Sequence, residues 1–116
     1  MTFLARMMKD RLVAGTARGL GVNGRTAVWV EANGMAEVVG AAYAYFLVAP
    51  GLPQSCANTN PPTALQYWSV PVRRMPRGIP FPFAEAWNME GDFGTRYRVT
   101  AANGDLTSNQ PDGSIY

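Results

Sequence analysis

The dipeptide Asn33-Gly34 is the feature that most constrains the fold of this chain, because it stands between two apolar-rich runs. These runs cover residues 26–32 and 35–39. An Asn-Gly pair can take positive φ at both central positions of a type I′ turn, whose twist matches that of paired strands. The pattern therefore predicts a β-hairpin over residues 24–48, with its second arm running on through the apolar residues 42–48.

The second arm, residues 35–48, also fits a helix. Its apolar residues recur at helical spacing, and Asn33 could cap such a helix. The run is nevertheless apolar on every face and rich in β-branched and aromatic residues, which favours a long strand bulged at Gly40. We predict the strand and keep the helix as the alternative.

Size and composition indicate a single globular domain over residues 1–116. The hydrophobic fraction of 47% excludes wholesale disorder, and 9 prolines and 12 glycines indicate many turns. The charged fraction of 16% is low, as in surfaces that other chains cover. We predict an α+β, mainly β fold, in which an N-terminal helix lies beside a small antiparallel sheet or partial barrel with long Pro-rich loops.

The N-terminal helix is expected over residues 1–20. Leu4, Met8 and Leu12 form an apolar stripe, and the glycines at 15, 19 and 21 end it. Such a stripe usually packs on the core of its own domain. In the alternative it docks on a neighbouring subunit, as an interaction helix with contact residues Phe3, Met7, Met8 and Lys9.

Prolines mark two extended loops, over residues 49–64 and 71–84, with a short strand at 65–70 between them. One helical turn is expected within 84–90. Another Asn-Gly pair at 103–104 predicts a C-terminal hairpin over residues 95–108.

The chain contains no histidine, which removes the commonest general base and zinc ligand. Cys56 is the single cysteine and has no partner for a disulfide or a CxxC motif. We therefore expect no catalytic residues, no metal and no cofactor, and an inert thiol at Cys56.

An acidic cluster beside a tryptophan gives a weaker hypothesis. Glu85, Glu90 and Asp92 surround Trp87 in the sequence, an arrangement that could act on or bind a sugar, or hold calcium. The spacing matches no recognised motif, so a solvated acidic loop is the simpler interpretation.

The best binding candidate is a group of arginines on the second Pro-rich loop. Arg73, Arg74 and Arg77 could clamp phosphates while Trp68 or Phe81 stacks a base. The same guanidinium groups could instead pair with carboxylates of another subunit. A plain solvated loop is the third interpretation.

Charge is segregated along the chain, since residues 1–30 carry a net +4 and residues 31–70 a net −2. Such a chain suits head-to-tail packing of copies or contact with unlike neighbours. We predict a non-enzymatic structural or interaction subunit of a homo-oligomeric or heteromeric assembly, for example a virus or phage particle. The alternatives are a small nucleic-acid-binding protein using the arginine loop, and a carbohydrate-binding or histidine-free enzyme domain. No secretion signal or membrane span is recognisable, so a cytoplasmic or virion location is expected.

Overall fold

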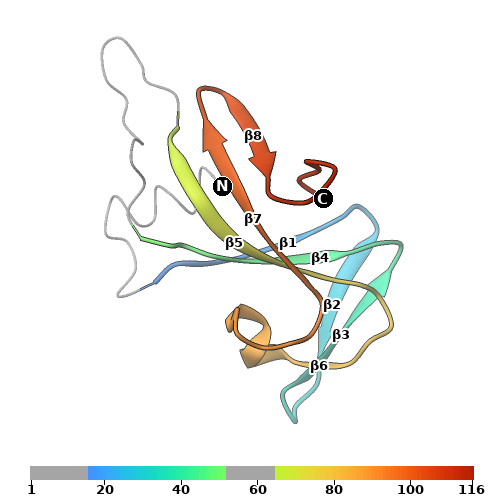
Figure 1. The fold of residues 1–116 in the computed structure, drawn as a ribbon. Coiled ribbons are helices and arrows are strands. Elements are labelled where there is room, and N and C mark those ends of the chain that lie inside the picture. Colours follow the sequence, from blue (N-terminus) through green and yellow to red (C-terminus); the bar gives the residue numbers. More distant parts are fainter. Residues whose placement is uncertain (1–15, 52–64) are drawn as a thin grey trace. The chain divides into compact units, whose positions relative to one another are not determined.

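A computed structural model describes residues 16–51 and 65–116, and these residues form mainly β-structure (Figure 1). The strands are β1 (Arg18–Val22), β2 (Thr26–Val30), β3 (Met35–Gly40), β4 (Ala44–Val48), β5 (Tyr67–Met75), β6 (Phe81–Pro82), β7 (Thr95–Ala102) and β8 (Asp105–Ser108). They form two antiparallel sheets, with five strands in the order β1-β4-β5-β7-β8 and three in the order β2-β3-β6.

The mainly β class is thus confirmed, whereas the helical and barrel components of the expectation find no counterpart in the described residues. The only helix there is the 3-10 turn η1 (Phe83–Trp87), which overlaps the range 84–90 where a single turn was predicted and begins one residue before it. No closed barrel forms among these residues. No helix in the described ranges is long and apolar enough to cross a membrane.

Two predicted elements fall largely outside the described residues. The helix at 1–20, with Phe3, Met7, Met8 and Lys9, lies outside them up to residue 15, and Cys56 in the loop at 49–64 also lies outside. The end of the predicted helix was wrong, because Arg18–Val22 is strand β1. Glycine is a poor helix former, and the alternation of Leu20 and Val22 with glycines suits an extended strand.

The hairpin around Asn33-Gly34 is confirmed, but its turn differs from the predicted type I′. β2 and β3 pair antiparallel with Trp29 opposite Glu37. The Glu31 N–H donates to the Met35 carbonyl at 2.8 Å, and the Gly34 N–H donates to the Glu31 carbonyl at 3.0 Å. Of the dipeptide only Gly34 takes positive φ, at 86°. The loop is therefore a turn followed by one left-handed residue, a common alternative to the two-residue turn.

The second arm is extended, as preferred over the helix, but it does not run on as one strand. β3 ends at Gly40, and Ala44–Val48 forms β4 in the other sheet. Gly40 has a φ of 111°, and a Cβ there would lie 2.2 Å from the Arg25 carbonyl oxygen. Only glycine fits this close approach of two backbones, so the chain turns a corner here and changes sheets.

The extended loop predicted at 71–84 was wrong for its first residues. Strand β5 continues through Tyr67–Met75, and its partner β4 places Phe46 opposite Arg73. Ser69 has a φ of 57°, so β5 is irregular two residues before Pro71, where the ladder loses an N–H donor. Phe81–Pro82 then adds the short strand β6 to β3.

The C-terminal hairpin is confirmed, and its turn is of type I′. β7 and β8 pair antiparallel, and Ala102 lies opposite Asp105. Asn103 and Gly104 have φ values of 52° and 87°, the two positive values that a type I′ turn requires. Figure 1 draws this hairpin as the adjacent β7 and β8 arrows.

The described residues gather into two compact units, and the boundary between them falls within strands β1, β4, β5 and β7. Unit 1 contains described residues 16–18, 48–51, 65–71 and 97–116, and unit 2 contains residues 19–47 and 72–96. The buried apolar residues of unit 1 are Ala17, Ala49, Tyr67, Val70, Tyr97, Val99 and Ala101. Those of the main cluster in unit 2 are Ala36, Val38, Ala44, Phe46, Met75, Phe81 and Ala86.

Candidate interaction site

The β2–β3 hairpin in unit 2 exposes large apolar side chains on one of its faces, which we call the outer face. Successive side chains of a strand point to opposite faces. Ala36 and Val38 are accordingly buried in the core, whereas Met35 and Val39 remain 36% and 39% exposed. Trp29, on the neighbouring strand, is 65% exposed. A tryptophan exposed to this extent beside other apolar side chains is typical of a surface that binds something.

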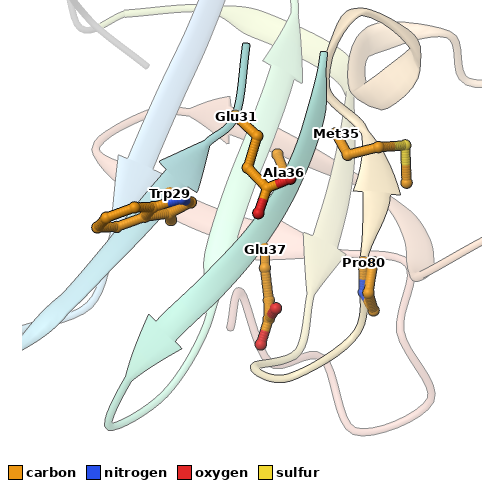
Figure 2. Close-up of a pocket in the computed structure, with 6 residues that line it drawn as sticks. All are labelled: Trp29, Glu31, Met35, Ala36, Glu37 and Pro80. Atoms are coloured by element: carbon orange, nitrogen blue, oxygen red, sulfur yellow. The ribbon is translucent and has the colours of Figure 1, made fainter. Parts of the chain in front are cut away.

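A cavity of about 240 Å³ opens on the outer face, and we call it the Trp29 pocket. Its lining residues, drawn in Figure 2, are Trp29, Glu31, Met35, Ala36, Glu37 and Pro80. In that view the carboxylates of Glu31 and Glu37 are drawn between Trp29 on the left and Met35 and Pro80 on the right. The register explains the grouping, because Trp29 lies directly opposite Glu37 and Glu31 is hydrogen-bonded to Met35.

The two glutamates give the pocket an acidic character. No arginine or lysine among the described residues forms an ion pair with either carboxylate; the pair described in unit 2 joins Arg96 to Asp92, at 3.9 Å. Both carboxylates can therefore accept hydrogen bonds from a group outside the described chain.

A second distinctive region of unit 2 surrounds Arg73, whose side chain is 0% exposed. Its Nε donates to the Ala86 carbonyl at 3.1 Å and its Nη2 to the Gly91 carbonyl at 3.0 Å. Nη1 donates to the Phe93 carbonyl and Nη2 also to that of Asn88. The guanidinium carbon lies 4.0 Å from the centroid of the Phe93 ring. We call these surroundings the Arg73 cage.

The Arg73 cage solvates a buried positive charge with no carboxylate of the described residues in direct contact. Burial lowers the pKa of the Arg73 guanidinium, the positive charge of Arg96 lowers it further, and the carboxylate of Asp92 acts in the opposite direction. Four carbonyl bonds and the face of Phe93 compensate for the lost water. Arg73 thus ties the segment 86–93 to strand β5.

This placement corrects the prediction that Arg73 is one member of an exposed arginine clamp. The alternation of β5 turns Arg73 into the core and leaves Arg74 half-buried, with its guanidinium carbon 5.2 Å from the centroid of the Tyr43 ring. Arg77 is exposed, and its Nη1 donates to the Gly40 carbonyl at 3.3 Å. The three arginines do not share one accessible surface.

The two aromatic partners proposed for the arginines also separate. Phe81 is 2% exposed and stacks on Phe93 at a centroid distance of 6.3 Å, so its ring is closed to a base. Trp68 is exposed in unit 1, and its indole N–H donates to Gln66 at 3.3 Å. Trp68 is thus exposed at the surface of unit 1, whereas Phe81 is part of the core of unit 2.

The acidic cluster near Trp87 does not form a pocket with that ring. Trp87 packs edge to face on Phe46 at 5.0 Å, and its Nε1–H donates to the Gly19 carbonyl at 3.1 Å. Glu85, Glu90 and Asp92 are exposed to solvent. Within the described ranges no group of three or more cysteine, aspartate or glutamate side chains could hold a metal ion.

Sequence reasoning missed the residues of the Trp29 pocket. The signal was the interleaving of acidic with apolar residues on both arms of the hairpin, Trp29 with Glu31 and Met35 with Glu37. Compared with protein-family models, with curated proteins and with solved structures, the chain matches none.

Proposed function

We propose that this chain is a non-enzymatic interaction subunit of a larger assembly, such as a virus or phage particle, in the cytoplasm or the virion. The observation that carries the proposal is the exposed apolar outer face of the β2–β3 hairpin, with Trp29, Met35 and Val39. Aromatic and methionine side chains are enriched at the centres of protein interfaces. The complete lack of histidine and the packing of the partly buried Trp87 ring against the core argue against an active site in the described residues.

The composition and the charge pattern support an assembly role. Charged residues make up only 16% of the chain, and the acidic outer face contrasts with a sequence in which Lys and Arg outnumber Asp and Glu by 10 to 8. Surfaces of opposite charge on the subunits of an assembly steer encounter and fix their orientation.

Sedimentation velocity and native mass measurement of the purified chain test this proposal. They are made over a range of concentrations, alone and after mixing with the purified products of neighbouring genes. We expect a defined complex, either with further copies or with one such product. The double variant Met35→Ser with Val39→Ser should weaken this complex, because it removes apolar area from the outer face.

The matched control is Leu20→Ser with Val22→Ser, since these side chains of β1 are 45% and 47% exposed but do not line the Trp29 pocket. A complex that responds only to the β1 pair would move the interface away from the outer face. A chain that stays monomeric in every mixture would refute the assembly role.

A further inference from the structure

We propose that the Trp29 pocket receives an arginine side chain of the partner subunit. This inference rests on the proposed function and specifies the chemistry of the contact. Three properties of the pocket carry it: its size, its charge, and the types of hydrogen-bonding group in its lining.

The size of the pocket suits one side chain. Its volume of about 240 Å³ lies below the ~300–1,000 Å³ that is usual for sites of small-molecule ligands and cofactors. Met35, Ala36 and Pro80 provide apolar contacts along part of the lining. The methylene stem of an arginine buries well against such groups while its charged end stays near polar ones.

The charge of the pocket selects a cation. Glu31 and Glu37 both contribute carboxylates, and neither forms an ion pair with a basic side chain of the described chain. Trp29 is the aromatic side chain best suited to a cation–π contact. A guanidinium combines a flat face for the indole with a fork of donors for carboxylates, and it is more weakly hydrated than an ammonium. The pocket should therefore prefer arginine to lysine.

The hydrogen-bonding groups favour a cation over a sugar. Sugar hydroxyls both donate and accept, so a site suited to them offers donors and acceptors in similar numbers, whereas side-chain acceptors outnumber donors in this pocket. The polar side-chain groups that line the Trp29 pocket are two carboxylates, which accept, and one indole N–H, which donates. A guanidinium has only donors to offer and matches the carboxylates without leaving acceptors of its own unpaired.

The proposal is tested by titrating the ¹⁵N-labelled chain with N-acetyl-L-argininamide while recording the indole N–H resonances by NMR. The resonance of Trp29 is identified with the variant Trp29→Phe. We expect it to shift in a saturable manner, and the citrulline counterpart, which has the same shape but no charge, to bind at least about fivefold more weakly. The lysine counterpart should bind about two- to fivefold more weakly than the arginine probe.

The double variant Glu31→Gln with Glu37→Gln should weaken arginine binding at least about fivefold, since it removes both charges and keeps the shape. The matched control is Glu85→Gln with Glu90→Gln, on exposed carboxylates that do not line the pocket, and it should bind as the wild type does. Equal binding of the citrulline probe, indifference to Glu31→Gln with Glu37→Gln, or tighter binding of a monosaccharide such as glucose would overturn the proposal.

The same variant separates this inference from the proposed function. A complex with the partner that depends on Met35 and Val39 but survives Glu31→Gln with Glu37→Gln would leave the assembly role standing and refute the arginine contact. Saturable arginine binding by a chain that forms no complex would refute the assembly role and leave the pocket as a guanidinium site.

Discussion

The Arg73 cage and the Trp29 pocket both present an aromatic face and oxygen acceptors suited to a cation, but they differ in where the cation comes from. In the cage the chain supplies its own arginine, fully enclosed and bonded to four carbonyls. The pocket is lined by two carboxylates and a tryptophan, and none of the described residues that line it is basic.

Within unit 2, the Arg73 cage is therefore suited to stabilising the fold, whereas the Trp29 pocket is suited to binding a partner. A buried charge whose nitrogens are all hydrogen-bonded adds to the free energy of unfolding, because removing it leaves several polar groups unpaired. Acceptors at the surface are hydrated and contribute little to folding, but they remain available for a partner. Substitutions in the cage should therefore lower the free energy of unfolding, whereas substitutions in the pocket should leave it nearly unchanged and weaken binding to the partner.

The largest effect is expected for Arg73→Ala. We expect it to lower the free energy of unfolding by about 4 kcal/mol, because the carbonyls of the segment 86–93 lose their donors and a cavity remains. Arg73→Lys should cost about 2 kcal/mol, since one ammonium cannot span the same acceptors. Chemical denaturation followed by tryptophan fluorescence measures both.

The control for the Arg73 variants is Arg77→Ala, on an exposed arginine two positions beyond the end of β5, which should stay within about 0.5 kcal/mol of the wild type. Similar small losses for Arg73→Ala and Arg77→Ala would mean that the cage contributes no more than a surface contact.

The next effect concerns Gly94, which follows Phe93 in the turn that completes the cage. Gly94 has a φ of 67°, and a Cβ there would lie 2.6 Å from Met75 Sδ and 2.8 Å from the Arg74 carbonyl oxygen. Gly94→Ala should therefore cost about 3 kcal/mol, from left-handed strain and from displacement of the turn. Thermal or chemical denaturation checks the value.

Gly113→Ala is a matched control for the backbone strain alone. Gly113 has a similar φ of 71°, but a Cβ at this position would meet no atom of the described residues within 4 Å. The substitution should cost about 1 kcal/mol. Equal losses at the two glycines would show that the close contacts of Gly94 can relax without cost.

The sequence predicted the two hairpins and the mainly β class, because an Asn-Gly pair between apolar runs strongly favours a hairpin turn. It did not predict the type of turn that each Asn-Gly pair adopts. At 103–104 both residues take positive φ, whereas at 33–34 only the glycine does. A type I′ turn at 33–34 would have paired Trp29 with Val38 instead of Glu37, and a shift of one residue moves a strand's side chains to the opposite face. The Trp29 pocket follows from this register and was therefore not predictable from the dipeptide.

Strand β5 is the second place where the structure differs from the prediction, because the prolines and arginines of this segment predicted an exposed loop. The burial of Arg73 depends on hydrogen bonds to carbonyls within residues 86–93. These partners are distant in the sequence, so the local pattern around Arg73 could not reveal them. Alternation along the strand would have placed Arg73 and Arg74 on opposite faces, but the prolines argued against a strand. β5 nevertheless includes Pro71, two residues after the irregular backbone at Ser69, and prolines within sheets are typically found near such irregularities.

A smaller effect is expected at an enclosed group of unit 1. Tyr67 is buried, its hydroxyl donates to the Gly51 carbonyl at 2.8 Å, and burial raises its pKa above the usual value of 10.0. The folded state thus favours the neutral phenol, so its contribution to stability is complete below about pH 10 and is lost as the pH rises through the raised pKa. Tyr67→Phe should cost about 1 kcal/mol at pH 7 and flatten the loss of stability at alkaline pH.

Denaturation at pH 7, 9 and 11 measures this dependence, with Tyr116→Phe as the control on a tyrosine that is 65% exposed. If the free energy of unfolding of Tyr67→Phe falls with rising pH as steeply as that of the wild type, the ionisation of other groups causes the loss of stability.

The smallest effect on folding is expected for Trp29→Ala, and here the contrast between cage and pocket is most direct. The side chain is 65% exposed, so the free energy of unfolding should change by no more than about 0.5 kcal/mol. Association with the partner should nevertheless weaken at least about tenfold, since exposed tryptophans at interfaces are often the residues on which binding depends.

Trp68→Ala, on a tryptophan that is 53% exposed in unit 1, is the matched control. The free energy of unfolding and the dissociation constant of the complex are measured on the same preparations. If Trp68→Ala abolished association while Trp29→Ala did not, the contact residue predicted from the sequence would be the right one, and the outer face would owe its exposure to something other than binding.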